Sequence, residues 1–261
     1  MNNKNIIITL IIVLSFFAIG LTSVMIMVIK NSSDFNFVFS LRGSKAKLVE
    51  SSEYDIDMID GIKMSTYSTD IEIRESSDKI KIQYYSSSRK NPKIMMENRI
   101  VTIDEKEDEV SCVGICDTNR KVVIYLPTSY AGLLDIVTKS GDIDSRTLLK
   151  NTNINTTSGD IELKEVSNVN IKTTSGDVEI YAVENFINVK TTSGDIEIQN
   201  FDIKENSILE SVSGDIEISN NLSNCYVDTH TLTGDIHINK SDRRNELEVR
   251  IKTTSGDIDV N

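Results

Sequence analysis

Seven aspartates recur along the C-terminal half of the sequence, each directly after the glycine of a Ser-Gly-Asp or Thr-Gly-Asp phrase. They stand 17 to 22 residues apart, at Asp142, Asp160, Asp177, Asp195, Asp215, Asp235 and Asp257. If successive copies stack at the usual β-sheet spacing of about 4.8 Å, neighbouring carboxylates repel by about 1 kcal/mol in water. Divalent cations relieve such repulsion, so the pattern predicts a Ca²⁺ ladder along Asp160, Asp177, Asp195 and Asp215.

A purely structural role for the same aspartates is the alternative. An aspartate beside a glycine often hydrogen-bonds the backbone N–H groups of a corner. The Gly-Gly-rich nonapeptide of calcium-binding β-rolls is absent from the sequence. Both interpretations stay open here, and no cofactor other than Ca²⁺ is expected.

Catalytic chemistry has few candidate residues. His230 and His237 are the only histidines, and both fall at positions predicted to face outward, which argues against a Ser-His or metal-His site. Paired carboxylates could serve a sugar-cleaving β-helix enzyme, but an active site breaks the regularity of one repeat, and no repeat is singled out. Tyr84 and Tyr85 could stack on a sugar, although tyrosines are common at strand ends. We therefore expect a protein that is not an enzyme.

The three cysteines allow one disulfide. Cys112 and Cys116 lie close together in SCVGIC, while Cys225 stands alone. Outside the membrane the first two could form a disulfide across a tight loop, or they could remain two reduced cysteines. Zinc is not expected, because no second Cys or His pair stands at a suitable spacing.

The repeated phrase lies between two short runs that alternate with period two, which is the geometry of β-strands. Mostly apolar residues fill the positions five before and two and four after the glycine, and a threonine or serine stands three before it. The alternation shifts by one residue at the glycine, so a corner or bulge is predicted there, with positive φ that glycine adopts without cost. The corner glycines are Gly141, Gly159, Gly176, Gly194, Gly214, Gly234 and Gly256.

These features predict an all-β fold, a β-solenoid-like stack of seven or eight repeats behind one N-terminal transmembrane helix. The array occupies residues 131–261, with loops of variable length along one edge. Residues 55–130 form an N-terminal β region, in which IKMSTYSTDIEI is a degenerate copy with Thr69 in the glycine place and further strands cap the first rung. The array is expected to end at TTSGDIDVN, an open last rung whose edge the charges of Asp257 and Asp259 protect.

Residues 6–29 are uncharged and long enough, at about 1.5 Å per residue, to cross about 30 Å of hydrocarbon. A cleaved signal peptide is the alternative, but its apolar region is shorter and ends at a small-residue cleavage site. We expect a single-pass cell-membrane anchor, with residues 1–5 as a short tail, residues 30–54 as a linker and the C-terminal domain outside. Basic residues after the helix favour the opposite orientation, so the outside placement depends on the repeats.

The charge of the chain limits its partners. It has 40 acidic and 28 basic residues and a formal net charge of −12. A chain this acidic is not expected to bind nucleic acid by neutralising phosphates. Cations and basic partners suit it better.

The phrase VVIYLP at residues 122–127, followed by NTTSGDIEL, KTTSGDVEI and KTTSGDIEI, resembles the LiaG-like adhesin family of bacterial surface proteins. The resemblance implies an all-β repeat fold at the cell envelope, sometimes beside envelope-stress regulators, and no known reaction. Two functions follow as expectations. One is a surface scaffold or adhesin-like module that binds an unknown cell-envelope protein or polysaccharide, and the other is an envelope-stress accessory protein that acts with a membrane partner.

Overall fold

The computed structural model describes residues 46–87, 92–105, 119–219, 222, 224–239, 241 and 244–261. They belong to a unit of residues 43–107 and 117–261, and β-strands dominate them. One 3-10 turn, Ile56–Met58, is the sole helical segment in these ranges, and none of their helices could span a membrane. The predicted transmembrane segment 6–29 and the Cys112–Cys116 pair lie outside the described residues.

Eighteen strands are described. The first seven are β1 (Lys47–Asp55), β2 (Gly61–Thr66), β3 (Asp70–Ser76), β4 (Lys79–Ser86), β5 (Lys93–Glu97), β6 (Ile100–Asp104) and β7 (Arg120–Pro127). The next four are β8 (Leu133–Ser140), β9 (Ile143–Ser158), β10 (Ile161–Lys172) and β11 (Val178–Ser193). The last seven are β12 (Ile196–Phe201), β13 (Ser207–Ser213), β14 (Ile216–Ile218), β15 (Tyr226–His230), β16 (Ile236–Ile238), β17 (Glu248–Lys252) and β18 (Ile258–Val260). Because β1 begins at Lys47, it occupies the end of the segment expected to be a linker.

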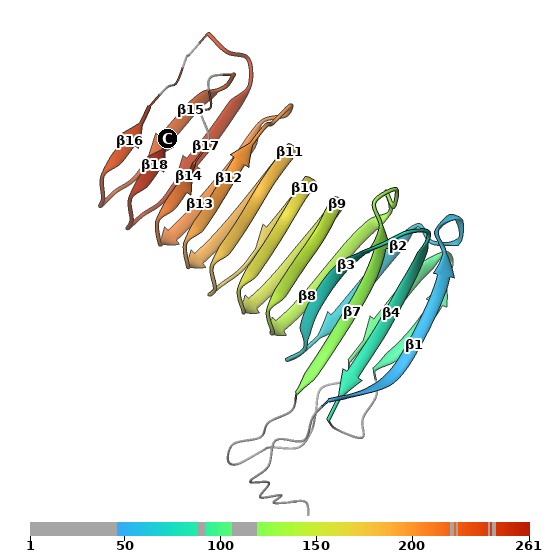
Figure 1. The fold of residues 1–261 in the computed structure, drawn as a ribbon. Coiled ribbons are helices and arrows are strands. Elements are labelled where there is room, and N and C mark those ends of the chain that lie inside the picture. The colour runs from blue at the N-terminus through green and yellow to red at the C-terminus, as the bar shows by residue number, and fades with distance from the viewer. Residues whose placement is uncertain are drawn as a thin grey trace, which may run out of the picture. The chain divides into compact units, whose positions relative to one another are not determined.

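The strands form two facing rows, one before and one after each corner glycine (Figure 1). We call the two strands that flank one glycine a rung and name it by that glycine. The pre-glycine row runs β5–β6–β2–β8–β9–β10–β11–β13–β17–β15, and the post-glycine row runs β1–β4–β7–β3–β9–β10–β11–β12–β14–β18–β16. Repeated rungs pair in parallel with equivalent residues opposite each other, such as Ile161 beside Val178.

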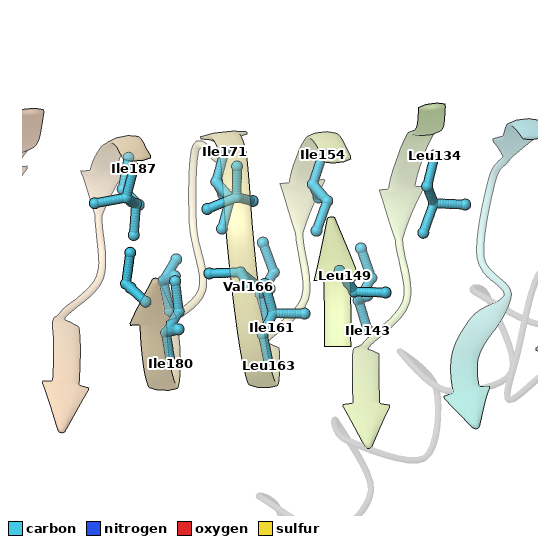
Figure 2. Close-up of a cluster of buried hydrophobic side chains, with 14 of the residues drawn as sticks. Leu134, Ile143, Leu149, Ile154, Ile161, Leu163, Val166, Ile171, Ile180 and Ile187 are labelled. Atoms are coloured by element: carbon cyan, nitrogen blue, oxygen red, sulfur yellow. The ribbon is translucent and has the colours of Figure 1, made fainter. Parts of the chain in front are cut away.

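The predicted inward columns form the core between the two rows. Ile136, Ile154 and Ile171 on the pre-glycine row are at most 2% exposed, as are Ile143, Ile161 and Val178 on the post-glycine row. Figure 2 shows side chains of the two rows pointing toward one another, with Ile171 above Ile161 and Leu163. Burying each such side chain contributes about 1.5–3 kcal/mol, so the alternation of apolar residues is what holds the rows together.

Strands β9, β10 and β11 are longer than the sequence predicted. Loops of variable length were predicted between the end of one copy and the start of the next. Instead each of these strands runs through from the post-glycine row to the pre-glycine row, and the pairing register shifts between Leu163 and Glu165 and between Val166 and Asn168. Bulges absorb the difference in repeat length, because they let one strand carry an extra residue without breaking the stack.

The two strands that flank Thr69 form a rung of the stack. Strands β2 and β3 pair with β8 and β9, and the carbonyl oxygen of Thr69 lies directly against Gly141. Beyond this rung lie β6 and β7, which pair with β2 and β3 although they follow them in the chain. Antiparallel strands then cover the end: β4 and β1 beside β7, and β5 beside β6. These antiparallel strands end the stack on this side.

The opposite end corrects the expectation that TTSGDIDVN is the open rung. Strands β17 and β18 of the Gly256 rung pair with β13 and β14 on one side and with β15 and β16 on the other. The Gly234 rung is therefore outermost, although it precedes the Gly256 rung in the chain. Figure 1 shows the C-terminus beside β18, inside the last strands of the stack. Asp257 and Asp259 accordingly do not lie on an open edge.

Candidate functional site

The repeated aspartates form a continuous hydrogen-bonded ladder along the corners. In each rung the Oδ1 atom accepts a hydrogen bond from the backbone N–H of the aspartate in the next rung, at 3.0 Å from Asp177 to Asp160 and 2.8 Å from Asp195 to Asp177. The same bond joins Asp215 to Asp195, Asp257 to Asp215 and Asp235 to Asp257. The ladder stabilises the stack by satisfying N–H groups that a sheet corner would otherwise leave to solvent.

In this geometry the aspartates hydrogen-bond backbone N–H groups of the corners, which is the structural role considered for them. In the described ranges no three His, Cys, Asp or Glu side chains gather as a set of metal ligands. One carboxylate oxygen of Asp160, Asp177, Asp195 and Asp215 is already engaged by a backbone N–H. Calcium binding at these four residues stays a prediction.

The corner glycines are required for two independent reasons. Gly194 has φ of +147°, a region that side-chain-bearing residues rarely adopt. A Cβ atom built on Gly194 would also lie 2.2 Å from the carbonyl oxygen of Gly176 in the rung below. The other six corner glycines have φ between +119° and +153° and equally close contacts. The corners are therefore a packing device, and the serines beside them need no catalytic explanation.

A buried ion pair holds the corner next to the capped end. Glu105 and Arg120 are 2.7 Å apart (Oε1 to Nη1), with side chains only 6% and 5% exposed. The Glu105 carboxylate also accepts hydrogen bonds from the hydroxyls of Tyr84 and Thr69 and from the backbone N–H of Tyr67. Burial and the negative charge of Glu105 raise the pKa of Tyr84 to about 12. The Tyr84 ring is buried, so it cannot stack on a sugar as the sequence allowed.

The outer surface of the post-glycine row carries two parallel columns of side chains, three and five residues after each glycine. The first column is acidic, with Asp144, Glu162, Glu179, Glu197, Glu217 and Asp259. The second column runs Arg146, Lys164, Tyr181, Gln199 and Ser219 along the same rungs. Its character therefore changes at Tyr181, from cations to neutral side chains.

The two columns interact differently on either side of that change. Toward the capped end, Arg146 pairs with Asp144 at 3.0 Å, and Glu72 is paired with both Arg74 and Lys121. Burial opposes the charged form of Glu72, but the hydrogen bonds from Lys121 and Arg74 outweigh it and lower the pKa of this carboxyl. Toward the open end the acids meet neutral groups, as where Gln199 donates to Glu179 at 3.3 Å and Ser219 to Glu217 at 3.4 Å.

A groove lies on this surface where the acids paired with cations give way to the acids that meet neutral side chains. Its lining includes Asp144, Arg146, Glu162, Lys164, Glu179 and Tyr181. The side chain of Tyr181 is 54% exposed, one of the most exposed large side chains described. A concave surface with an exposed aromatic ring and several donors and acceptors has the make-up of a ligand site. We call it the Tyr181 groove.

The sequence analysis did not identify the Tyr181 groove. The sequence did contain a signal. The residue five after the corner glycine is Arg146 and then Lys164 in the first two copies, and Tyr181 in the third, but this position was not compared between copies. A second groove on the outer surface of the pre-glycine row is lined by Asn155, Lys172, Thr174, Lys190 and Thr192 among others. It offers hydroxyls and ammonium groups and no exposed ring.

Two polar arrangements on β9–β11 also went unpredicted. Asparagines of successive rungs form side-chain ladders, with Asn185 donating to Asn168 at 2.6 Å and Asn168 to Asn151 at 3.2 Å. Beside them Glu165 is hydrogen-bonded to Glu184, and burial together with this bond raises the pKa of Glu165. Both histidines are exposed, as predicted, and His237 Nδ1 lies 3.4 Å from Asp259.

Comparisons place this architecture among known folds. The model of the Toastrack DUF4097 family matches residues 59–261. No curated protein sequence matches the chain. A solved structure named "putative lipid binding protein", from Parabacteroides distasonis, is 18% identical with a TM-score of 0.50, over 81% of this chain and 96% of that one. A "putative adhesin" from Bacteroides fragilis is 14% identical with a TM-score of 0.47, over 85% and 100% of the two chains.

Proposed function

We propose that this chain, which belongs to the Toastrack DUF4097 family, is a non-enzymatic, adhesin-like binding module of the bacterial cell surface whose ligand lies in the Tyr181 groove. The ligand class that suits the groove is a polysaccharide of the cell envelope. Residues 6–29 anchor the module in the cell membrane, and the repeats lie outside. The parallel, in-register rungs support a β-solenoid-like organisation of LiaG-like type.

The Tyr181 groove is the observation that carries this proposal. A sugar ring has an apolar face that can rest on an exposed aromatic ring, and hydroxyls that need both donors and acceptors. The groove supplies the ring at Tyr181, donors at Arg146 and Lys164, and acceptors at Glu162 and Glu179. Because β9, β10 and β11 are paired along their length, these groups are held on a rigid surface.

The repeated form of the surface suits a polymer. Acidic and neutral columns continue for several rungs beyond the groove, at about 4.8 Å per rung. A chain-like ligand can therefore contact successive rungs, and each weak contact adds to the others through effective concentration. A small substrate would not need such a surface.

Titration of the full chain in detergent micelles with purified cell-wall polysaccharide fragments, followed by calorimetry, tests the proposal. Tyr181→Ala should weaken binding about two- to tenfold, because stacking contributes about 0.5–1.5 kcal/mol. Tyr125→Ala is the matched control, since Tyr125 pairs with Arg74 in the same outward column but lies outside the groove. Equal binding by Tyr181→Ala and wild type, or no binding of any fragment, would refute the sugar site.

An envelope-stress accessory role is the second candidate. It is favoured by the acids toward the open end. Glu197 lies in register beside Glu217, which accepts a hydrogen bond from Ser219, and the two acids could receive a basic segment of a membrane partner. Lysine-rich peptides should then bind with strong salt dependence, and Glu197→Gln with Glu217→Gln should abolish this binding. Salt-independent binding would reject this role.

A further inference from the structure

Two lysines lie directly beside each other on the outer surface of the pre-glycine row. Lys172 of β10 and Lys190 of β11 are register partners on adjacent parallel strands. Each stands between two buried residues, so both side chains point outward. Like charges that face each other across a strand pair are destabilising. In a chain with a net charge of −12, this unfavourable pair of cations calls for an explanation.

The chain itself neutralises only one of the two lysines. The ammonium nitrogen of Lys190 is 2.8 Å from the carboxylate of Glu210, its register partner on β13. On the other side, the register partner of Lys172 is the neutral Asn155 of β9, and the residues two before and two after Lys172 on its own strand are neutral too. Within the described ranges Lys172 takes part in no ion pair. One positive charge is therefore left without a counter-charge at this place.

This charge lies in the second groove, on a concave surface. The lining of the groove includes both lysines, Asn155 and the outward side chains of Thr174 and Thr192. None of its lining residues is acidic or aromatic. Ammonium, hydroxyl and amide groups can all donate hydrogen bonds. The make-up of this groove is therefore opposite to that of the Tyr181 groove, which contains three carboxylates and a ring and lies on the other row.

We propose that this second groove, which we call the Lys172 groove, binds a phosphate group. An ammonium acts as a point charge and is a common partner of phosphate, whereas a planar carboxylate is matched better by arginine. Two ammonium groups on successive rungs, with backbones about 4.8 Å apart, can donate to different oxygens of one tetrahedral anion, and the hydroxyl of Thr174 or Thr192 can donate to a third. The anion supplies the missing counter-charge. Its source is the free ion or a phosphodiester of a polymer.

Calorimetric titration of the full chain in detergent micelles with linear polyphosphate, in phosphate-free buffer with about 0.1 M salt, tests the site. Lys172→Gln should weaken binding at least about tenfold, because a hydrogen bond between charged groups is lost. Lys252→Gln is the matched control, since Lys252 also stands four residues before its corner glycine but lies outside the groove. It is three rungs from Lys172, about 14 Å, so salt screens its charge and affinity should change by less than about twofold. Equal loss in both variants, or no binding by wild type, overturns the proposal.

A variant that gains binding separates the site from a general loss of attraction. Glu210→Gln releases Lys190 from its ion pair, so polyphosphate should bind more tightly, by up to about fivefold. Glu248→Gln is the control, because it also removes one acid from an ion pair, with Arg250, on the same row but outside the groove. Tighter binding by Glu210→Gln alone supports the site. Equal tightening by both variants would show an effect of net charge and overturns it.

Two further titrations decide the source and the class of the anion. Displacement of polyphosphate by inorganic phosphate assigns the Lys172 groove to the free ion, and binding that persists assigns it to the polymer, whose successive groups add to the affinity. Either result supports a phosphate site. Polyglutamate presents a carboxylate in each unit in place of a phosphate. If it binds as tightly as polyphosphate and loses as much affinity in Lys172→Gln, the groove does not select phosphate and the proposal is overturned.

Discussion

The two ends of the stack are finished in opposite ways. At one end the antiparallel strands β1, β4 and β5 cover the first rungs, and the buried Glu105–Arg120 pair closes the corner. At the other end the Gly234 rung has the same repeated form as the rungs behind it. No described strand is stacked on it, and the Ser241 side chain hydrogen-bonds the outer edge of β15 at Val227. Repeat arrays need caps to remain soluble, so an uncapped end calls for a short edge or a partner.

The comparison shows that unique sequence and repeated sequence have separate tasks. The capped end depends on residues that do not recur from rung to rung, such as Arg120, and its own antiparallel strands cover it. The repeats use the same glycine and aspartate in successive rungs, and they provide a long outer surface for contacts. We therefore assign binding to the repeats and stability to the cap.

Gly194→Val should have the largest effect, because it breaks the stack on which both ends depend. A β-branched residue would be forced to φ of +147° with its Cβ 2.2 Å from the Gly176 carbonyl oxygen, so rungs must separate. We expect a loss of at least about 4 kcal/mol, measured by urea unfolding. Thr192→Val, an exposed position on the same strand, should change the free energy of unfolding by less than about 0.5 kcal/mol. An unchanged melting temperature for Gly194→Val would show that Gly194 does not occupy a corner that requires glycine.

Arg120→Met should damage the capped end and leave the open end intact. It leaves the Glu105 carboxylate buried without its cation, which costs about 3 kcal/mol. Adding Glu105→Gln to the same chain should recover much of this loss, because no buried charge remains. The amide oxygen can still accept from the Tyr67 N–H and the Thr69 hydroxyl, while the amide NH2 can donate to the Tyr84 hydroxyl. If the double variant is no more stable than Arg120→Met, the pair is not the closing element of this end.

Replacing corner aspartates should distinguish the interior of the stack from its open end. Asp195→Ala removes an acceptor of the Asp215 N–H and should cost about 1 kcal/mol. Asp235→Ala should cost close to nothing, because Asp235 lies on the outermost rung, where no described rung follows whose N–H could donate to it. Equal costs in chemical unfolding would mean that another element covers the Gly234 rung.

The smallest effect concerns pH and the Glu165–Glu184 pair in the middle of the stack. Burial, with the bond to Glu184, raises the pKa of Glu165 above its unfolded value, so its contribution is present at low pH and is lost as pH rises through the folded pKa. Glu184→Gln should therefore flatten the pH dependence of the free energy of unfolding above pH 4.5, by less than about 1 kcal/mol. An identical profile for the variant and wild type would show that the two carboxyls do not share a proton.

Much of the repeat architecture was predictable from the sequence, but the order of the last two rungs and the Glu105–Arg120 pair at the capped end were not. The inward columns and the corner at glycine follow from period-two alternation, which needs no knowledge of tertiary contacts, and Thr69 fitted the same frame. The order of the last two rungs depends on whether the Gly234 copy or the Gly256 copy packs better against the Gly214 rung. Both copies have short strands and the same repeated phrase, so the sequence does not reveal this order. Thr229, which replaces an apolar residue of the inward column, was the available signal for an uncovered rung. Glu105 and Arg120 belong to no repeated motif and come together only in the folded chain, so no sequence spacing indicated the ion pair.

Hydrogen exchange of the full chain, resolved by strand, tests the central claim that the Gly234 rung is the open end. Amides in edge strands exchange faster than those paired on both sides, because local opening exposes them first. The account predicts faster exchange in β15 and β16 than in β17 and β18, even though β17 and β18 end the chain. In a chain with its rungs stacked in sequence order, β17 and β18 would exchange fastest, and that result would contradict the account.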